Sequence, residues 1–184
     1  MSAWLSVLLL SGAVQAEPPK LPTLSADEQS KLAAGKVVFR PGEGSALSVG
    51  VLDVDAPPDK VITQILNAKA RVGGAVKEVI IYQEEGDLVA ARYESTVLGT
   101  SNVVHMVLEC DRTSGYCKFW MDKTKENHIE DIYGDYVVVE NGSGSRVYHR
   151  KYVNPVDWMP DFMRGKVISK SIEQELILIE NLVE

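Results

Sequence analysis

The residues that could perform chemistry in this sequence are few and dispersed. Three histidines, His105, His128 and His149, stand far apart in the chain, and two cysteines lie close together at Cys110 and Cys117. A metal site needs three or four clustered ligands, so this spacing predicts none. The glycine-rich stretches lack the spacing of a serine-nucleophile turn or a phosphate-binding loop. We therefore expect no catalytic residue, no metal and no cofactor, and a function that depends on a binding pocket.

The two cysteines have a structural use instead. They flank the polar segment 111–116, and both neighbouring segments show the alternation of β-strands. A four-residue turn at 112–115 would place Cys110 opposite Cys117 in an antiparallel pair, close enough for a disulfide. The alternative is two reduced thiols in the core. A disulfide needs an oxidising compartment, so it would fit an exported protein.

The amino terminus also indicates export. Residues 1–16 hold an apolar stretch followed by small residues, and a polar segment begins at Glu17. An apolar stretch of about 8–12 residues is too short to span a bilayer stably and fits a signal peptide cut after Ala16. No Lys or Arg precedes it, which is atypical, and an uncleaved anchor is the alternative. We expect a signal peptide at 1–16, a linker at 17–24 and one domain at 25–184, in a periplasmic or secreted protein.

Composition and charge limit the partners. The chain has 184 residues, 45% of them apolar and 24% charged, which is typical of one globular domain. Its formal net charge of −7 gives no general attraction to phosphate backbones. We therefore expect no nucleic-acid partner, and any contact with an anionic membrane would be transient.

The elements that must position a site follow from periodicity. Ser25 and Glu28 form a capping box for a first helix, and Pro57-Pro58 opens a second one. Two strands are expected between these helices, at 36–40 and 47–55. Alternation with period two then predicts six antiparallel strands joined by hairpin turns, at 79–83, 88–98, 102–110, 117–124, 133–140 and 146–153.

One long helix is expected at the end of the chain. Pro160 fits its first turn, and an apolar stripe then recurs at Ile168, Ile172, Leu176, Ile179 and Val183. A helix must bury such a stripe, and the large apolar surface on offer is one face of the sheet.

Alternation assigns side chains to that face. It places Tyr93, Met106, Phe119 and Met121 there. The last strand allows two options. If Val147 and Val153 point inward, His149 and Lys151 do so too; if Tyr148 and Tyr152 point inward, His149 and Lys151 are solvated. An unpaired His or Lys in an apolar interior is costly, so the first option would make both functional candidates.

This order of elements resembles the helix-grip superfamily, which includes START-type lipid-transfer domains, polyketide cyclases and the birch-pollen allergen. The resemblance rests on segment 54–61, Val-Asp-Ala-Pro-Pro-Asp-Lys-Val, and on 144–147 with 154–160, which are similar to the last strand and helix start of bacterial START-like and coenzyme-Q-binding relatives. It covers the chain from about residue 47 onward. It implies an α+β fold, a curved antiparallel sheet wrapped around a long C-terminal helix with an apolar tunnel between them. A lipocalin-like barrel is the alternative fold, and a close-packed interior is the alternative to a tunnel.

The resemblance implies a ligand between sheet and helix. Residues at the start of the last helix would lie beside the tunnel entrance, where methionine and aromatic side chains suit a flexible aliphatic guest. Core packing is the alternative for each of them. The expected ligand-binding residues are Tyr93, Met106, Phe119, Met121, His149, Trp158, Met159, Phe162 and Met163.

We therefore expect an exported, non-catalytic carrier or binder of a lipid, sterol or isoprenoid. Burial stabilises an aliphatic chain by about 0.8 kcal/mol per methylene relative to water, so a carrier needs little beyond a polar anchor. Two alternatives stay open. One is a cyclase or dehydratase in which Tyr93 or His149 acts as general acid or base. The other is a protein-interaction module that holds no ligand.

Overall fold

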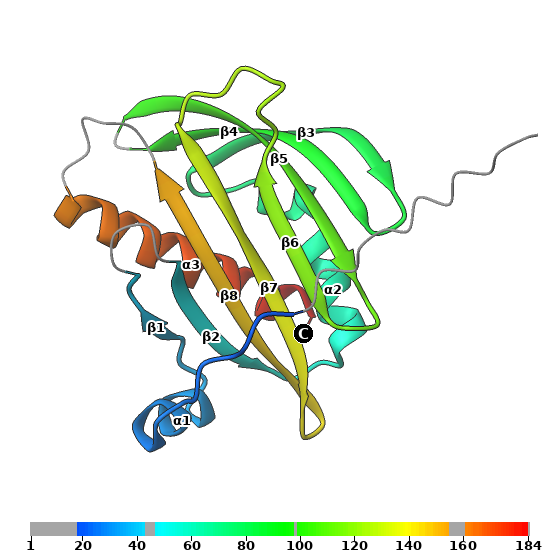
Figure 1. Cartoon of the computed structure of the whole chain (residues 1–184), viewed down its shortest axis with the longest axis vertical. Helices are drawn as coiled ribbons and strands as arrows, with labels where there is room; N and C mark the ends of the chain where they lie inside the picture. The colour runs from blue at the N-terminus through cyan, green and yellow to red at the C-terminus, as the bar shows by residue number, and fades with distance from the viewer. Residues whose placement is uncertain (1–17, 43–46, 98, 155–160, 184) are drawn as a thin grey trace, which may run out of the picture.

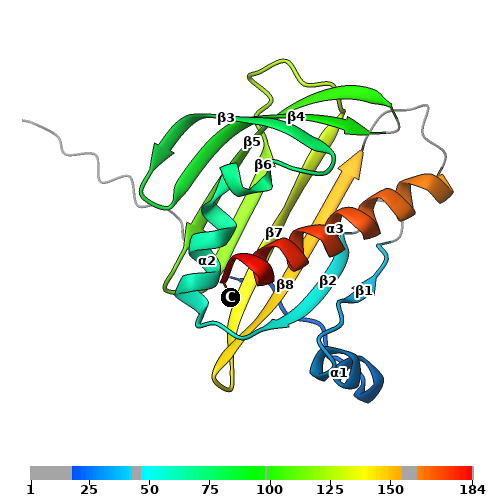
Figure 2. The same ribbon diagram turned by 180° about the vertical axis from the view of Figure 1, so that it is seen from behind.

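The architecture is a single curved antiparallel sheet with one long helix across its concave face (Figures 1 and 2). The computed structural model describes residues 18–42, 47–97, 99–154 and 161–183, with the backbone alone for residue 97 and residues 161–164. In chain order the elements are α1 (Ala26–Ala33), β1 (Val38–Arg40), β2 (Ser48–Val54), α2 (Pro58–Leu66), the 3-10 helix η1 (Ala68–Arg71), β3 (Val76–Glu85), β4 (Leu88–Val97), β5 (Thr100–Asp111), β6 (Tyr116–Met121), β7 (Asp131–Asn141), β8 (Gly144–Asn154) and α3 (Asp161–Val183).

The strands pair in the order β1-β2-β8-β7-β6-β5-β4-β3, and each pair is antiparallel. Strands β3 to β8 are joined by consecutive hairpins, because short turn segments connect alternating runs in this part of the sequence. Strand β2 then pairs with β8, so the second and the last strands of the domain lie side by side, and β1 forms the edge of the sheet. The expected α+β helix-grip architecture is confirmed, whereas η1 was not expected.

Helix α1 begins where the sequence predicts. The Ser25 hydroxyl accepts a hydrogen bond from the Glu28 backbone N–H, and the Glu28 carboxylate accepts one from the Ser25 N–H. The Arg40 side chain on β1 also pairs with Glu28. Leu32 of α1 packs against the outer face of the sheet with Val51 and Tyr148. This helix is therefore remote from the concave face (Figure 1).

Helix α3 lies directly on one half of the sheet. All five residues of its predicted stripe are buried: Ile168, Ile172, Leu176, Ile179 and Val183. A Cβ built on Gly50 in β2 would lie 2.2 Å from Ile172 Cγ2 and 2.9 Å from Leu176 Cδ1, so the absence of a side chain there permits the contact. Strands β3, β4 and β5 extend beyond the helix (Figure 2). On the β3–β4 side, Ala68 of η1 packs on Val79, Val89 and Ala91 instead.

The hairpin between β5 and β6 carries the expected disulfide. Cys110 pairs with Cys117 in the register, as Asp111 does with Tyr116, and the two sulfur atoms are bonded. Cys117 is fully buried on the concave side, next to Phe119 in the core. The bridge therefore holds the pairing of two strands that contribute to the interior.

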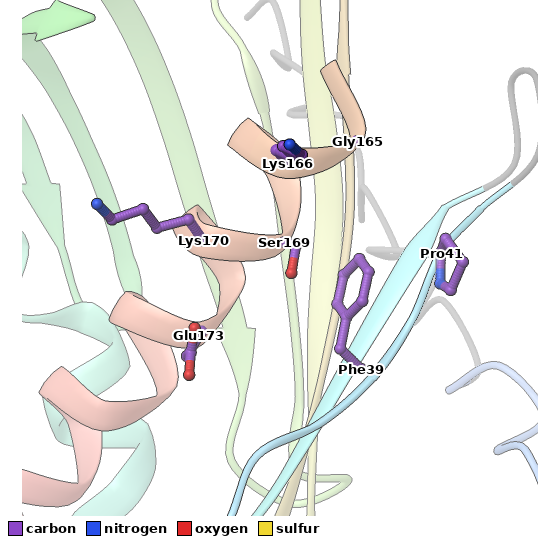
Figure 3. Close-up of a pocket in the computed structure, with 7 residues that line it drawn as sticks. All are labelled: Phe39, Pro41, Gly165, Lys166, Ser169, Lys170 and Glu173. Atoms are coloured by element: carbon purple, nitrogen blue, oxygen red, sulfur yellow. The ribbon is translucent and has the colours of Figure 1, made fainter. Parts of the chain in front are cut away.

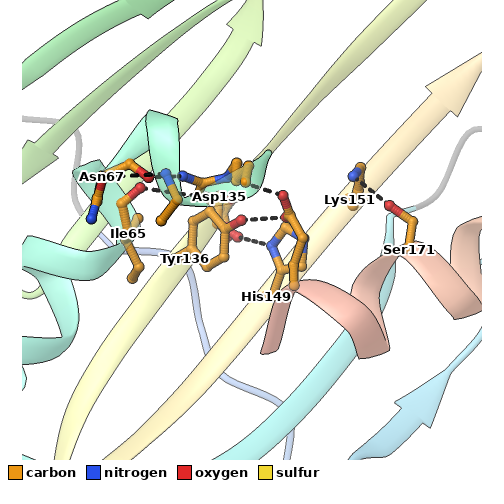
Figure 4. A network of polar contacts seen from close by, with 10 residues as sticks. Ile65, Asn67, Asp135, Tyr136, His149, Lys151 and Ser171 are labelled. Carbon is orange, nitrogen blue, oxygen red and sulfur yellow. Dashed lines mark hydrogen bonds and ion pairs between the residues drawn. The ribbon is translucent and has the colours of Figure 1, made fainter. Parts of the chain in front are cut away.

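The structure decides between the two orientations of the last strand. His149 of β8 is fully buried and Lys151 is 7% exposed, and both point to the α3 side (Figure 4). Tyr148 packs instead in the outer cluster with Leu32 of α1. Two ionisable side chains are thus enclosed between the sheet and the helix.

Candidate functional site

A small cavity lies between α3 and the middle of the sheet. Its walls come from η1, from strands β4 to β7 and from α3, and its volume is about 20 Å³, enough for one water molecule. Apolar side chains form one side, and charged or hydroxyl-bearing ones form the other. The lining residues are Arg71, Tyr93, Met106, Leu108, Phe119, Tyr136 and Glu175.

This cavity is much smaller than a tunnel for an acyl chain. As described, it has room for one small molecule such as water. The reason is the close approach of α3 to β2 at Gly50, which brings the stripe of the helix into the concave face. Any larger guest would need the helix or the β4–β5 wall to move.

Glu175 is the centre of a polar cluster inside this apolar interior. Its Oε1 accepts a hydrogen bond from Arg71 Nε at 3.3 Å. Its Oε2 accepts one from the Tyr136 hydroxyl at 2.5 Å and lies 3.1 Å from His149 Nε2. Figure 4 shows Tyr136 and His149 side by side, next to α3. Three side chains, from η1, β7 and β8, thus meet at one carboxylate of α3.

The Arg71 side chain is held by the backbone as well as by Glu175. Its Nη2 donates to the carbonyl oxygen of Ile65 at 2.9 Å, and its Nη1 donates to that of Asn67 at 3.1 Å. These carbonyls come from the end of α2 and the residue that follows it, where helical carbonyls lack an intrahelical partner. The guanidinium therefore ties α2 and η1 to α3.

The pKa values in the cluster follow from burial and from the paired charges. Burial alone would raise the pKa of Glu175, but Lys151, His149 and Arg71 together hold it well below its ordinary value. Burial, with Glu175 nearby, raises the pKa of Tyr136 well above its usual range. Burial also raises the pKa of Tyr93. At neutral pH Glu175 is thus a carboxylate and Arg71 a charged guanidinium, while Tyr136 and the neighbouring Tyr93 keep their hydroxyl protons.

His149 is a neutral member of the cluster. Its ring stacks on Tyr136 with centroids 4.1 Å apart and an interplanar angle of 7°. Its Nδ1 lies 3.4 Å from the Asp135 carbonyl oxygen, while Nε2 is near Glu175 without the alignment of a hydrogen bond. Burial lowers the pKa of His149, and Glu175 offsets only part of that shift. The imidazole therefore contributes packing and a dipole, not a charge, at neutral pH.

No family model and no curated protein matches the sequence. Several solved structures, however, are similar to this fold. A START superfamily protein from Mycobacterium smegmatis is 14% identical with a TM-score of 0.63, over 75% of this chain and 97% of that one. The STAR-related lipid transfer protein from Xanthomonas axonopodis is 16% identical with a TM-score of 0.61, over 80% and 92%. The Zhui aromatase/cyclase from a Streptomyces species is 13% identical with a TM-score of 0.52, over 80% and 90%.

The chain has the START-like helix-grip fold. The expected resemblance to this superfamily is confirmed at the level of the fold, and identities this low establish the fold alone. The cavity lies between the concave face of the sheet and α3, where the sequence predicts the ligand.

The START-like cavity brings together part of the expected ligand set. Tyr93, Met106 and Phe119 line the cavity, while Met121 is buried in the core beside it and His149 lies behind Glu175. The structure does not describe the side chains of the other four expected residues. Trp158 and Met159 lie outside the described residues, and the side chains of Phe162 and Met163 do as well.

Sequence reasoning missed the charged half of the site. Glu175 falls three residues after Ile172 and four before Ile179, so a carboxylate on the buried stripe was the available signal. Arg71 gives no such signal, because it follows a helix in a polar segment and meets Glu175 across 104 positions. The position of Tyr136, in contrast, could be predicted from alternation in β7, since Tyr136 shares a buried face with Val138.

A second, larger hollow lies on the outer side of α3. It measures about 530 Å³ and runs between β1 and the first turns of the helix (Figure 3). None of its lining residues belongs to the Glu175 cluster: they are Phe39, Pro41, Gly165, Lys166, Ser169, Lys170 and Glu173. It is a solvent-facing groove, and we do not assign the ligand to it.

The neutral His149 makes stability sensitive to acid. Because its pKa in the folded protein lies below the ordinary value of 6.5, the unfolded chain binds more protons below that pH. The stabilisation from the buried neutral ring is therefore complete above that pH and is lost as the pH falls toward the folded pKa. Urea unfolding should show a lower free energy of unfolding at about pH 5.5 than at about pH 7.5. This difference should shrink in His149→Phe, and equal pH dependence in the two proteins would contradict the assignment.

Proposed function

We propose that this START-like protein binds a hydrophobic or amphipathic small molecule between α3 and strands β4–β6, as a carrier and not as an enzyme. The observation that carries the proposal is the lining of the cavity. Met106, Leu108 and Phe119 form an apolar wall, opposite the half-buried Arg71 and Glu175 pair. Apolar surface with a few convergent polar groups is typical of ligand pockets. The names of two similar structures, a START superfamily protein and a STAR-related lipid transfer protein, agree with it.

The wall of strands β4 and β5 is where the cavity can enlarge. Tyr93, Val104 and Met106 are half-buried although they face the concave side, because α3 covers the other half of the sheet (Figure 2). Methionine is flexible and polarisable, so it adapts to guests of different shape. A guest entering here would cover apolar surface that is now partly in water, gaining roughly 25 cal/mol per Å².

The ligand class that we propose is a lipid, sterol or isoprenoid, and we propose that the protein is exported. Export is supported by the disulfide, which needs an oxidising compartment, and by the leader-like residues 1–16. In the described part of the chain, no helix combines the length and the apolar character of a membrane span. Because the net charge is −7, contact with an anionic membrane during loading would be transient.

The direct test is native mass spectrometry, with organic extraction, of protein purified from its own host. We expect one lipid-like molecule per chain. Met106→Trp, which fills the cavity, should lower ligand occupancy at least about tenfold. Val107→Trp is the matched control, because Val107 is next on the same strand and faces away from the cavity. Absence of any ligand from the wild-type protein would instead favour a module that binds another protein.

An enzyme of the cyclase or dehydratase kind is the second candidate. The observation in its favour is the Tyr136 hydroxyl and the Glu175 carboxylate at the edge of an apolar cavity, together with the name of one similar structure, an aromatase/cyclase. Against this candidate, burial raises the pKa of both Tyr93 and Tyr136, so the pKa of each phenol moves away from neutral pH, where a general acid or base works best. His149 lies behind Glu175 and does not line the cavity. Recovery of a chemically altered ligand after incubation would favour the enzyme.

A further inference from the structure

Lys151 is a buried cation whose hydrogen-bond partner is neutral. Its side chain is 7% exposed and reaches from β8 toward α3 (Figure 4). Its Nζ donates to Ser171 Oγ at 2.8 Å. None of the ion pairs given for the described side chains includes Lys151. An ammonium in an apolar interior is costly unless an anion accompanies it.

The charges around Lys151 do not balance. Glu175 is the carboxylate that Arg71 contacts at 3.3 Å, and the charges of Lys151 and Arg71 both lower its pKa. His149 is neutral because burial lowers its pKa. Two cations, Lys151 and Arg71, therefore share one carboxylate in the described interior, and Lys151 acts on it through space without bonding to it. A group with one negative charge would complete the balance.

One aromatic ring separates Lys151 from the cavity. Lys151 pairs with Gly134 across the sheet, and Gly134 pairs with Phe119. A Cβ built on Gly134 would lie 2.6 Å from Phe119 Cζ, so the ring lies over this glycine. The same ring lines the cavity. A change of the Phe119 rotamer would thus connect the apolar cavity with the lysine.

We propose that the ligand is a long-chain carboxylate, with its head group bound by Lys151 and Ser171 and its aliphatic body along the Met106, Leu108 and Phe119 wall. The inference rests on the proposed function, since it names the chemical class of the guest in the same interior. A carboxylate accepts several hydrogen bonds, and bonds in which both partners are charged are about twice as strong as neutral ones. The lysine therefore selects an acid over an alcohol of equal length.

The test compares two probes that differ in the head group alone, dodecanoic acid and 1-dodecanol, by titration calorimetry on purified protein freed of lipid. The wild-type protein should bind the acid at least about tenfold more tightly. Lys151→Met should bring the affinity for the acid down to that for the alcohol and leave the alcohol unchanged. Lys151→Arg should keep the preference. Lys170→Met, an exposed lysine on the outer side of α3, is the matched control and should change neither affinity.

The outcomes separate this inference from the proposed function. Equal wild-type affinities for the two probes would overturn the carboxylate assignment and leave hydrophobic binding intact, and this comparison needs no variant to fold. A preference for the acid that survives in Lys151→Met would also overturn it. Failure of both probes to bind, with no ligand extracted from the native protein, would remove the proposed function and the inference together.

Discussion

Replacing Glu175 with alanine is expected to lower the free energy of unfolding by about 3–5 kcal/mol. The substitution removes the counter-charge of Arg71, whose guanidinium stays enclosed between η1 and α3, and it leaves the positive charge of Lys151 nearby uncompensated. The Tyr136 hydroxyl loses its acceptor in the same step. Urea denaturation at neutral pH measures the change directly.

Glu173→Ala is the matched control for this experiment. Glu173 is an exposed glutamate on the same helix, two positions earlier, and its removal should change stability by no more than about 0.5 kcal/mol. The double variant Arg71→Met with Glu175→Leu should be less destabilised than Glu175→Ala, because it replaces the whole ion pair with apolar side chains. A cost below about 1 kcal/mol for Glu175→Ala would show that the pair is not enclosed as the structure has it.

Replacing Gly50 with alanine is expected to destabilise the protein by about 1–3 kcal/mol. The usual effect of this change in a strand is a gain of roughly 0.5–1 kcal/mol, because glycine loses more backbone freedom on folding. Here the new Cβ would lie 2.2 Å from Ile172 Cγ2, so α3 must shift away from β2. A decrease in the free energy of unfolding would therefore indicate that α3 contacts β2 at Gly50.

Thermal or urea unfolding of Gly50→Ala, compared with Gly165→Ala, provides the measurement. Gly165 lies in α3, and no atom stands within 4 Å of a Cβ built on it, so alanine there should stabilise the helix by about 0.5–1 kcal/mol. If Gly50→Ala were stabilising as well, α3 would not rest on β2. A displaced helix would also enlarge the cavity, so occupancy by an extracted ligand should not fall in Gly50→Ala.

The hydrophobic pattern was sufficient to predict most of the fold. The order of the strands, the turn that pairs Cys110 with Cys117 and the stripe of α3 all follow from local periodicity and turn chemistry, which act over a few residues. The predicted strand ends differ from those of the structure by up to three residues. The 3-10 helix η1 was not predicted, because a single short turn after α2 leaves no periodic signal.

The candidate site was predictable in its apolar half alone. Tyr93, Met106 and Phe119 follow from alternation, which tells which side chains share a face of a strand. The Arg71 to Glu175 contact joins positions 104 residues apart, and no local rule brings them together. For β8, alternation left the orientation open, since the inward set with His149 and Lys151 is as mixed in polarity as the outward one.

By itself, therefore, the sequence determined the order of helices and strands, the register of the cysteine hairpin and the apolar face of the last helix. Those features depend on neighbouring residues and on burying apolar surface, which is not directional. Tertiary structure alone decided that the cavity is small and that His149 and Lys151 are buried near the half-buried Glu175. Both results depend on how closely α3 approaches β2 at Gly50, a distance set by packing between segments remote in the chain.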